Sequence, residues 1–299
     1  MATNFSENEL NYARKKFYGK LYVIKSNLNI FDKILNKILI YIFLLKISLV
    51  NFKRHIFKIA SSKINLKNDH KSFNFSYSLD DNSIEKASND LKLKNFTFVE
   101  NFLSPESYKY LNDNWPNINY FKHHKQIIKH FSSGFRHKKE SPIEKTFNRF
   151  NNYFVLRKFY EYLLSNEFNK FYNKLINFEN NSYELGAISS KMASKDSYLI
   201  PHIDGIFKKD KRSKHYNFIY FLDGYDKNPD LGGATGFYKD NEFKSPIFIP
   251  HTIKNSLLIY NQSHDFYHGF KAIDCPKGIY RKTVGFQINP IWLLIKKMK

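Results

Sequence analysis

Cysteine is almost missing from the sequence, since Cys275 is the single one among 299 residues. One thiol cannot form an intrachain disulfide, so the chain is not a disulfide-stabilised scaffold. It also excludes a zinc cluster built from several cysteines. Residues 1–7 are polar and show no apolar signal-peptide core. We therefore expect a chain that works in a reducing, cytoplasmic compartment.

Arginine is scarce although the chain is strongly basic. There are 48 Lys and Arg against 27 Asp and Glu, which gives a formal net charge of +21. The arginines are confined to positions 14, 54, 136, 149, 157, 212 and 281. A basic surface attracts the phosphate backbone of a nucleic acid whatever its base sequence. Readout of base edges, by contrast, most often uses the planar guanidinium of arginine. The composition therefore argues against nucleic-acid binding as the main function.

Long apolar runs are also lacking. Residues 31–61 have apolar side chains at three- and four-residue steps, which predicts a helix. Their densest apolar stretch, 38–45, is shorter than the roughly 20 residues that a transmembrane helix needs. Two interpretations stay open: the helix packs on the rest of the chain, or it lies as a basic amphipathic helix on the inner face of a membrane. In the second case the residues facing anionic head groups are Lys46, Lys53, Arg54 and Lys58.

The chain divides into two parts of different texture. Residues 61–88 are polar and aperiodic, which indicates a linker. We expect a basic, largely helical extension with its linker over 1–90, and one domain over 91–299. Helices are predicted to begin at Ser104 and Ser141, because each precedes a proline, and the second is to continue to about residue 176.

The last third of the chain is typical of a β-protein. Eight short β-like runs are separated by turn signals containing glycine, proline and asparagine. They cover 184–192, 198–203, 215–222, 235–238, 246–249, 256–260, 267–273 and 281–288. The predicted fold class is therefore mainly β with flanking helices (α+β), arranged as a sandwich or barrel.

Three features of these strands indicate a metal site. His202 and Asp204 are two residues apart, so on a strand both point to the same face. His268 lies on a later predicted strand. Two histidines and one carboxylate form the facial triad of non-haem Fe(II) oxygenases. Arg281 opens the final strand with Thr283 on the same face, and a guanidinium there can bind a carboxylate through paired hydrogen bonds.

The order of these motifs resembles the 2-oxoglutarate- and Fe(II)-dependent oxygenases, specifically the prolyl 4-hydroxylase-like group. The similarity covers roughly residues 92–292. The matching residues are Phe98 to Ser104, Tyr198-Leu199-Ile200-Pro201-His202-Ile203-Asp204-Gly205, Tyr220-Phe221-Leu222, Gly232-Gly233, His268-Gly269-Phe270 and Arg281-Lys282-Thr283.

This resemblance implies a fold, a cofactor set and a reaction. The fold is a double-stranded β-helix, also called a cupin-like jelly roll. Fe(2+) is held by His202, Asp204 and His268, while 2-oxoglutarate is chelated to the metal and its distal carboxylate binds Arg281 and Thr283. O2 is the second co-substrate. The enzyme is then a dioxygenase that hydroxylates an unactivated C–H bond and releases succinate and CO2.

Two site positions stay open in the sequence. Enzymes of this group often place a tyrosine on the second core strand to help hold the keto acid, whereas the aligned residue here is Phe221. Either Tyr220 belongs there and the register is shifted by one, or Thr283 and Asn217 share the role. His264 competes with His268 for the metal, and the family spacing favours His268.

The substrate is not named by the sequence. Peptide side chains, amino acids, saccharides and lipids all remain open. Lysines in the loop 207–214, after the first two predicted ligands, suggest an anionic substrate. The alternative function is a non-catalytic basic jelly-roll module that associates with nucleic acid or an anionic membrane.

Overall fold

The computed structural model describes residues 73–118, 121–125, 133–136, 154–176, 183–203, 216–261 and 265–290. The helix expected over 31–61 and the basic loop 207–214 lie outside these ranges. Among the described residues, no helix is long and apolar enough to span a bilayer.

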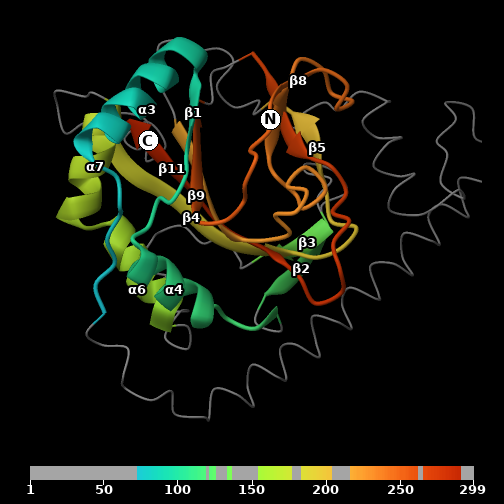
Figure 1. The fold of residues 1–299 in the computed structure, drawn as a ribbon, viewed down its shortest axis with the longest axis horizontal. Helices are drawn as coiled ribbons and strands as arrows, with labels where there is room; N and C mark the ends of the chain where they lie inside the picture. Colours follow the sequence, from blue (N-terminus) through green and yellow to red (C-terminus); the bar gives the residue numbers. More distant parts are fainter. Residues whose placement is uncertain are drawn as a thin grey trace, which may run out of the picture.

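Two antiparallel sheets form the centre of the domain (Figure 1). The larger sheet has the order β1-β9-β6-β11-β4-β3-β2, and the smaller sheet has the order β5-β10-β7-β8. The larger sheet consists of β1 (Phe96–Val99), β2 (Lys122–Lys125), β3 (Ser133–Arg136), β4 (Tyr183–Ala193), β6 (Tyr216–Asp223), β9 (Ser256–Asn261) and β11 (Arg281–Pro290). The smaller one consists of β5 (Leu199–His202), β7 (Gly236–Tyr238), β8 (Pro246–Phe248) and β10 (Tyr267–Phe270).

The connections of β4 to β11 define a jelly roll. Along the chain, β4, β6, β9 and β11 lie in the larger sheet, while β5, β7, β8 and β10 lie in the smaller one. The chain therefore passes repeatedly from one sheet to the other, as in a double-sheet roll of eight strands. The predicted fold is confirmed, and each of the eight expected β-runs overlaps one of these strands.

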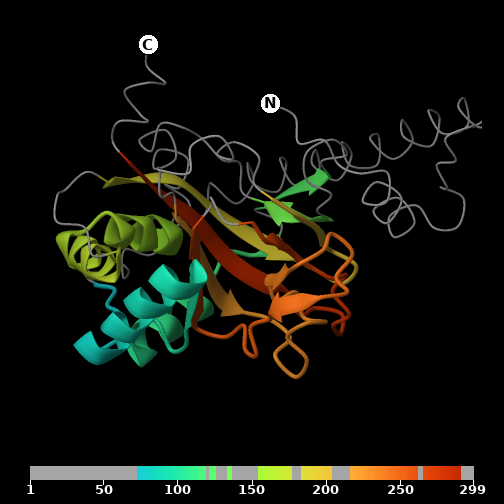
Figure 2. The same ribbon diagram turned by 90° about the horizontal axis from the view of Figure 1, so that it is seen from above.

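Four helices cover the outer face of the larger sheet, opposite the smaller sheet (Figure 2). They are α3 (Asp81–Lys94), α4 (Pro105–Asp113), α6 (Phe154–Leu163) and α7 (Asn166–Ile176). The alternation of strand side chains creates two separate cores. On β6, Phe218 and Tyr220 pack with the helices, whereas Phe221 packs between the sheets.

Two expectations about helices are corrected or refined. The linker predicted up to residue 88 is wrong for its last part, because α3 begins at Asp81 and crosses the expected boundary at 90. The Asp80 side chain accepts a hydrogen bond from the Ser83 backbone N–H at 2.8 Å and so caps this helix. Ile84 is buried in the helix-side core. Residues 73–88 therefore belong to the folded domain.

Of the two helix starts predicted at serines, one is confirmed and the other lies outside the described residues. Ser104 caps α4, with Pro105 at its first turn, as expected. Ser141 lies outside the described ranges. In the segment predicted to be helical up to about residue 176, the structure has two helices, α6 and α7, which are separated at positions 164–165.

Candidate active site

Two histidines meet where β5 and β10 pair in the smaller sheet. His202 and His268 are directly opposite each other in the antiparallel register, and their ring centroids are 4.3 Å apart. Both side chains are buried. Imidazoles this close can share one ion, since metal–nitrogen bonds are about 2.0–2.1 Å long. The structure thus brings together the two predicted histidine ligands, 66 positions apart in the sequence.

The third predicted ligand, Asp204, lies outside the described residues, as does the competing His264. No group of three His, Cys, Asp or Glu side chains suited to a metal occurs within the described ranges. His202 ends β5, and Asp204 follows two positions later. The histidine pair fits the predicted metal by its donor chemistry, and the role of Asp204 stays a prediction.

Arg281 is the most unusual charge in the described structure. It is 5% exposed and opens β11 in the middle of the larger sheet. Its Nη2 donates to Thr235 Oγ1 at 2.9 Å, and its Nη1 donates to Thr283 Oγ1 at 3.4 Å. Its Nε has no hydrogen-bond partner among the described atoms. No salt bridge joins it to a described carboxylate, and burial lowers its pKa to about 9.

Aromatic and aliphatic groups surround this guanidinium. Its central carbon lies 4.4 Å from the ring centroid of Phe270 and 5.3 Å from that of Phe221. Phe270 is two residues beyond His268 on β10. The arrangement holds a positive charge in an apolar layer near the histidine pair, and an isolated buried charge is costly unless an anion compensates it.

The register of β6 answers the open question about Phe221. Phe221 is paired with Thr283 on β11 and faces Arg281. Tyr220 points to the helix side, where its hydroxyl donates to Asn255 Oδ1 at 2.9 Å. The structure therefore puts Phe221, and not Tyr220, on the same side of the sheet as Arg281. Thr283 accepts a hydrogen bond from Arg281, and its predicted contact with the keto acid stays a prediction.

Asn217 lies beside the histidines rather than beside Arg281. Its Nδ2 donates to the Tyr260 hydroxyl at 3.0 Å. The Tyr260 ring centroid is 5.0 Å from that of His268. Asn217 and Tyr260 are directly opposite on β6 and β9, so their contact follows from the register. This pair supports the His268 ring, which is a different role from the keto-acid contact considered in the sequence.

Thr235 and Tyr260 are site residues that the sequence motifs did not single out. Thr235 comes directly before β7, and Tyr260 lies on β9. Neither stands at a fixed spacing from a predicted ligand, because each is brought to the site by the pairing of strands that are distant in sequence. The nearest residues that the sequence motifs included were Gly232 and Gly233, and Gly233 lies two positions before Thr235.

Comparisons with known proteins give structural neighbours only. No family model and no curated protein sequence matches the chain. Among solved structures, it is similar to a 2OG-Fe(II) oxygenase family oxidoreductase from Burkholderia pseudomallei, at 9% identity and a TM-score of 0.46, covering 73% of this chain and 95% of that one.

Two prolyl hydroxylases are similar to the same degree. The enzyme from Trichoplax adhaerens, solved with a hypoxia inducible factor peptide, has 13% identity and a TM-score of 0.47, over 70% of this chain and 89% of that one. The Pseudomonas putida prolyl-4-hydroxylase has 10% identity and a TM-score of 0.46, over 70% and 99%. These names agree with the resemblance of the motifs. At such identities and scores, reaction and substrate must be inferred from the residues of the site.

Proposed function

We propose that the chain is an Fe(II)- and 2-oxoglutarate-dependent dioxygenase that hydroxylates a C–H bond of its substrate. The observation that carries this proposal is Arg281: a buried guanidinium without a described acidic partner, in the same inter-sheet layer as two adjoining histidines. A structural ion pair would supply its own carboxylate. A buried arginine that lacks one is suited to the carboxylate of a ligand.

Each residue has a separate task in this proposal. His202, His268 and Asp204 hold the metal, and Arg281 binds the distal carboxylate of the keto acid. Thr235 and Thr283 accept hydrogen bonds from the guanidinium and fix its plane. The bound metal and keto acid supply the oxidising chemistry, with succinate and CO2 as the products of the keto acid. The surrounding aromatic side chains exclude water from the reacting centre.

The test measures 2-oxoglutarate binding and turnover separately. Anaerobic calorimetry on the Mn(II)-loaded full chain gives the affinity, and succinate formation with Fe(II), O2 and a metabolite extract gives the activity. Arg281→Gln should weaken 2-oxoglutarate binding about 100-fold, because two charge-assisted hydrogen bonds are lost at roughly 1.5 kcal/mol each. Arg157→Gln is the matched control, since Arg157 forms a surface ion pair with Glu161 on α6.

Histidine variants test the metal. His202→Ala and His268→Ala should each abolish Mn(II) binding and succinate formation. His251→Ala should change neither, because His251 is an exposed histidine that contacts Glu100. Unchanged 2-oxoglutarate affinity in Arg281→Gln, or full activity in a chelated preparation, would refute the proposal. Salt-sensitive binding to DNA or anionic vesicles without keto-acid turnover would favour the non-catalytic alternative.

A further inference from the structure

The pairing of β5 with β10 is irregular directly beside the two histidines. His202 is opposite His268, whereas the next aligned pair is Leu199 with Phe270. Two residues of β5 therefore lie opposite the single residue Gly269 of β10. Such an extra residue is a β-bulge, which bends its strand and re-aims the side chains next to it. The bulge ends at His202, so it affects the direction from which this histidine approaches its partner.

The sequence favours a bulge at this position. Pro201, the residue before His202, has no backbone N–H and cannot donate to the ladder of a sheet. Within sheets, proline is therefore confined to edge strands and bulges, and β5 is an edge strand of the smaller sheet. The proline ring also fixes φ, so the bend that leads into His202 is built into the chain.

Gly269 lies under this bulge and is in close contact with its backbone. A Cβ built on Gly269 would lie 2.5 Å from the Leu199 carbonyl oxygen, 2.8 Å from the Pro201 nitrogen and 2.9 Å from Pro201 Cα. Real Cβ atoms essentially never come within 3.0 Å of such neighbours. All three contacts are backbone atoms, so no side-chain rotation can relieve them. Only glycine allows β5 and β10 to approach as closely as they do here.

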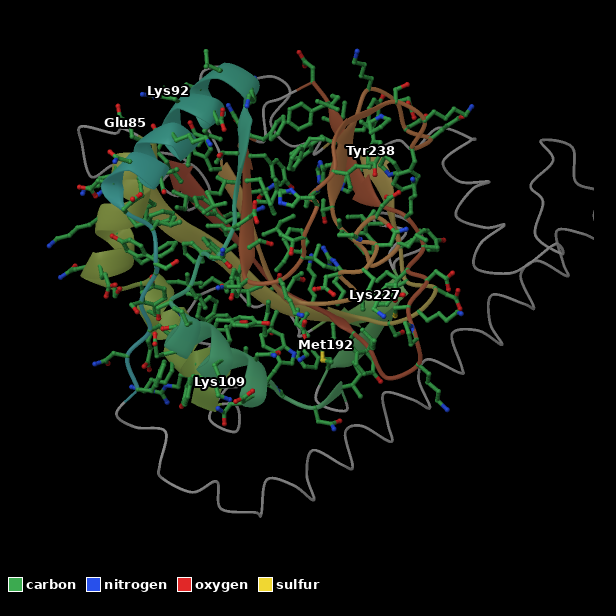
Figure 3. All side chains as sticks on the ribbon, in the orientation of Figure 1. Glu85, Lys92, Lys109, Met192, Lys227 and Tyr238 are labelled. Carbon is green, nitrogen blue, oxygen red and sulfur yellow. The ribbon has the colours of Figure 1, made fainter. Side chains whose placement is uncertain are left out.

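Two further strand glycines differ from Gly269 in what surrounds them. Gly236 on β7 is opposite Gly269, and its Cβ position is also crowded, by the Tyr238 hydroxyl at 2.8 Å and the Phe248 carbonyl oxygen at 3.0 Å. Figure 3 shows Tyr238 among the strands of the smaller sheet. These contacts come from β7 and β8 and do not involve β5. Gly285 on β11 has room, since its nearest neighbour is 3.7 Å away.

The contact at Gly269 bears on the spacing of the two histidines. Non-bonded atoms rest about 3.5 Å apart, so an alanine at 269 would displace a strand by about 1 Å. β10 is paired with β7 on its other side, so β5, the edge strand, is the one that moves, and His202 moves with it. The rings of His202 and His268 are 4.3 Å apart, and a metal site tolerates displacements of only about 0.5 Å. A displacement of this size would separate the two histidines.

We propose that Gly269 is a positioning residue for the metal site: together with the bulge at Pro201, it brings β5 and β10 close enough for His202 and His268 to bind one ion. That an ion is bound rests on the proposed function. That Gly269 sets the histidine spacing rests on the strand contact alone. Gly269 has no side chain to coordinate an ion, so it acts through the two histidines.

The test measures metal binding to the full chain without turnover. The nitrogen splitting in the EPR spectrum of bound Cu(II) distinguishes two coordinated imidazoles from one, with His268→Ala as the reference for a site that has lost one. Anaerobic calorimetry gives the affinity for Mn(II). Gly269→Ala should lose the two-imidazole spectrum and bind Mn(II) on the order of 10–100-fold more weakly, the range for residues that orient metal ligands.

Two glycine variants are the controls. Gly236→Ala introduces a comparable clash away from β5, so it should lower the stability in urea and keep both the two-imidazole spectrum and the wild-type Mn(II) affinity. Gly285→Ala adds a methyl group where there is room, and it should keep all three properties. If Gly269→Ala shows no cooperative unfolding, Pro201→Ala takes its place. This variant frees the bulge without adding an atom to the contact, and should weaken Mn(II) binding up to about tenfold.

The outcomes separate this inference from the proposed function. The inference is wrong if every folded variant of Gly269 or Pro201 binds Mn(II) as the wild type does. It is also wrong if Gly236→Ala loses the two-imidazole spectrum as Gly269→Ala does, because the effect is then common to the whole sheet. A wild type without a two-imidazole spectrum overturns both proposals. If only Gly269→Ala loses that spectrum while the wild type neither binds nor turns over 2-oxoglutarate, the positioning role stands and the oxygenase proposal falls.

Discussion

Gly233 gives the sharpest test of how Arg281, the arginine proposed to bind the keto acid, is positioned. Its φ is +93°, in the left-handed region, and a Cβ built on it would lie 2.8 Å from Arg281 Cδ and 2.9 Å from Ile273 Cδ1. An L-residue in this region costs about 1–2 kcal/mol. The two clashing atoms are near the ends of flexible side chains, so they can move, and relieving such overpacking costs about 1–3 kcal/mol. Gly233→Ala should therefore lower the free energy of unfolding by about 2–5 kcal/mol.

The same substitution should weaken 2-oxoglutarate binding, because Arg281 is pushed from its position between Thr235 and Thr283. A partial loss of one charge-assisted hydrogen bond should lower the affinity for 2-oxoglutarate about tenfold. Gly278 is a matched control: its φ is +92°, and nothing lies within 4 Å of its Cβ position. Gly278→Ala should show the backbone cost alone in urea unfolding, with unchanged affinity in anaerobic calorimetry. Equal affinities in the two variants would refute the placement of Arg281 by Gly233.

Three further predictions concern stability and reactivity. Arg281→Gln should leave the melting temperature of the ligand-free protein unchanged or higher, since it removes a buried charge that has no described acidic partner; a large decrease would show that the arginine is structural. Asn255→Ala should cost about 3 kcal/mol in urea unfolding, because the side chain loses bonds to both backbone groups of Leu103 and to the Tyr220 hydroxyl; a cost below about 1 kcal/mol would contradict this. Burial raises the pKa of Cys275, so the thiolate fraction of this residue at about pH 8 is small. Iodoacetamide should therefore alkylate Cys275 in the native protein more slowly than it alkylates free glutathione, and urea should remove this difference. Equal rates for the native protein and glutathione would contradict the burial.

The strands were predictable because their signals are local. Alternation and turn residues lie within each run of four to ten residues, and each of β4 to β11 is found where expected. The linker prediction failed at 81–88, where Asp80 caps a helix within a polar stretch. Asp at a helix cap and Asp in a turn use the same side-chain-to-backbone hydrogen bond, so the sequence alone does not separate them.

The site was predictable only where its residues carry rare chemistry. His202, His268 and Arg281 were singled out by their types and order, and the structure places the two histidine rings 4.3 Å apart. Thr235 was missed because threonine is common and its contact with Arg281 depends on how the two sheets face each other. Contacts of this kind join residues that are distant in sequence, and they are set by the pairing of the strands.

The position of β11 has a consequence for how the protein is made. This strand lies between β4 and β6 in the larger sheet, yet it follows every other strand in the sequence. Until residue 290 has left the ribosome, β4 and β6 are both open edges, and open edges pair readily with other chains. Arg281 arrives with this same strand. The nascent chain can therefore close its larger sheet and bring Arg281 into place only in one step, once β11 has been synthesised.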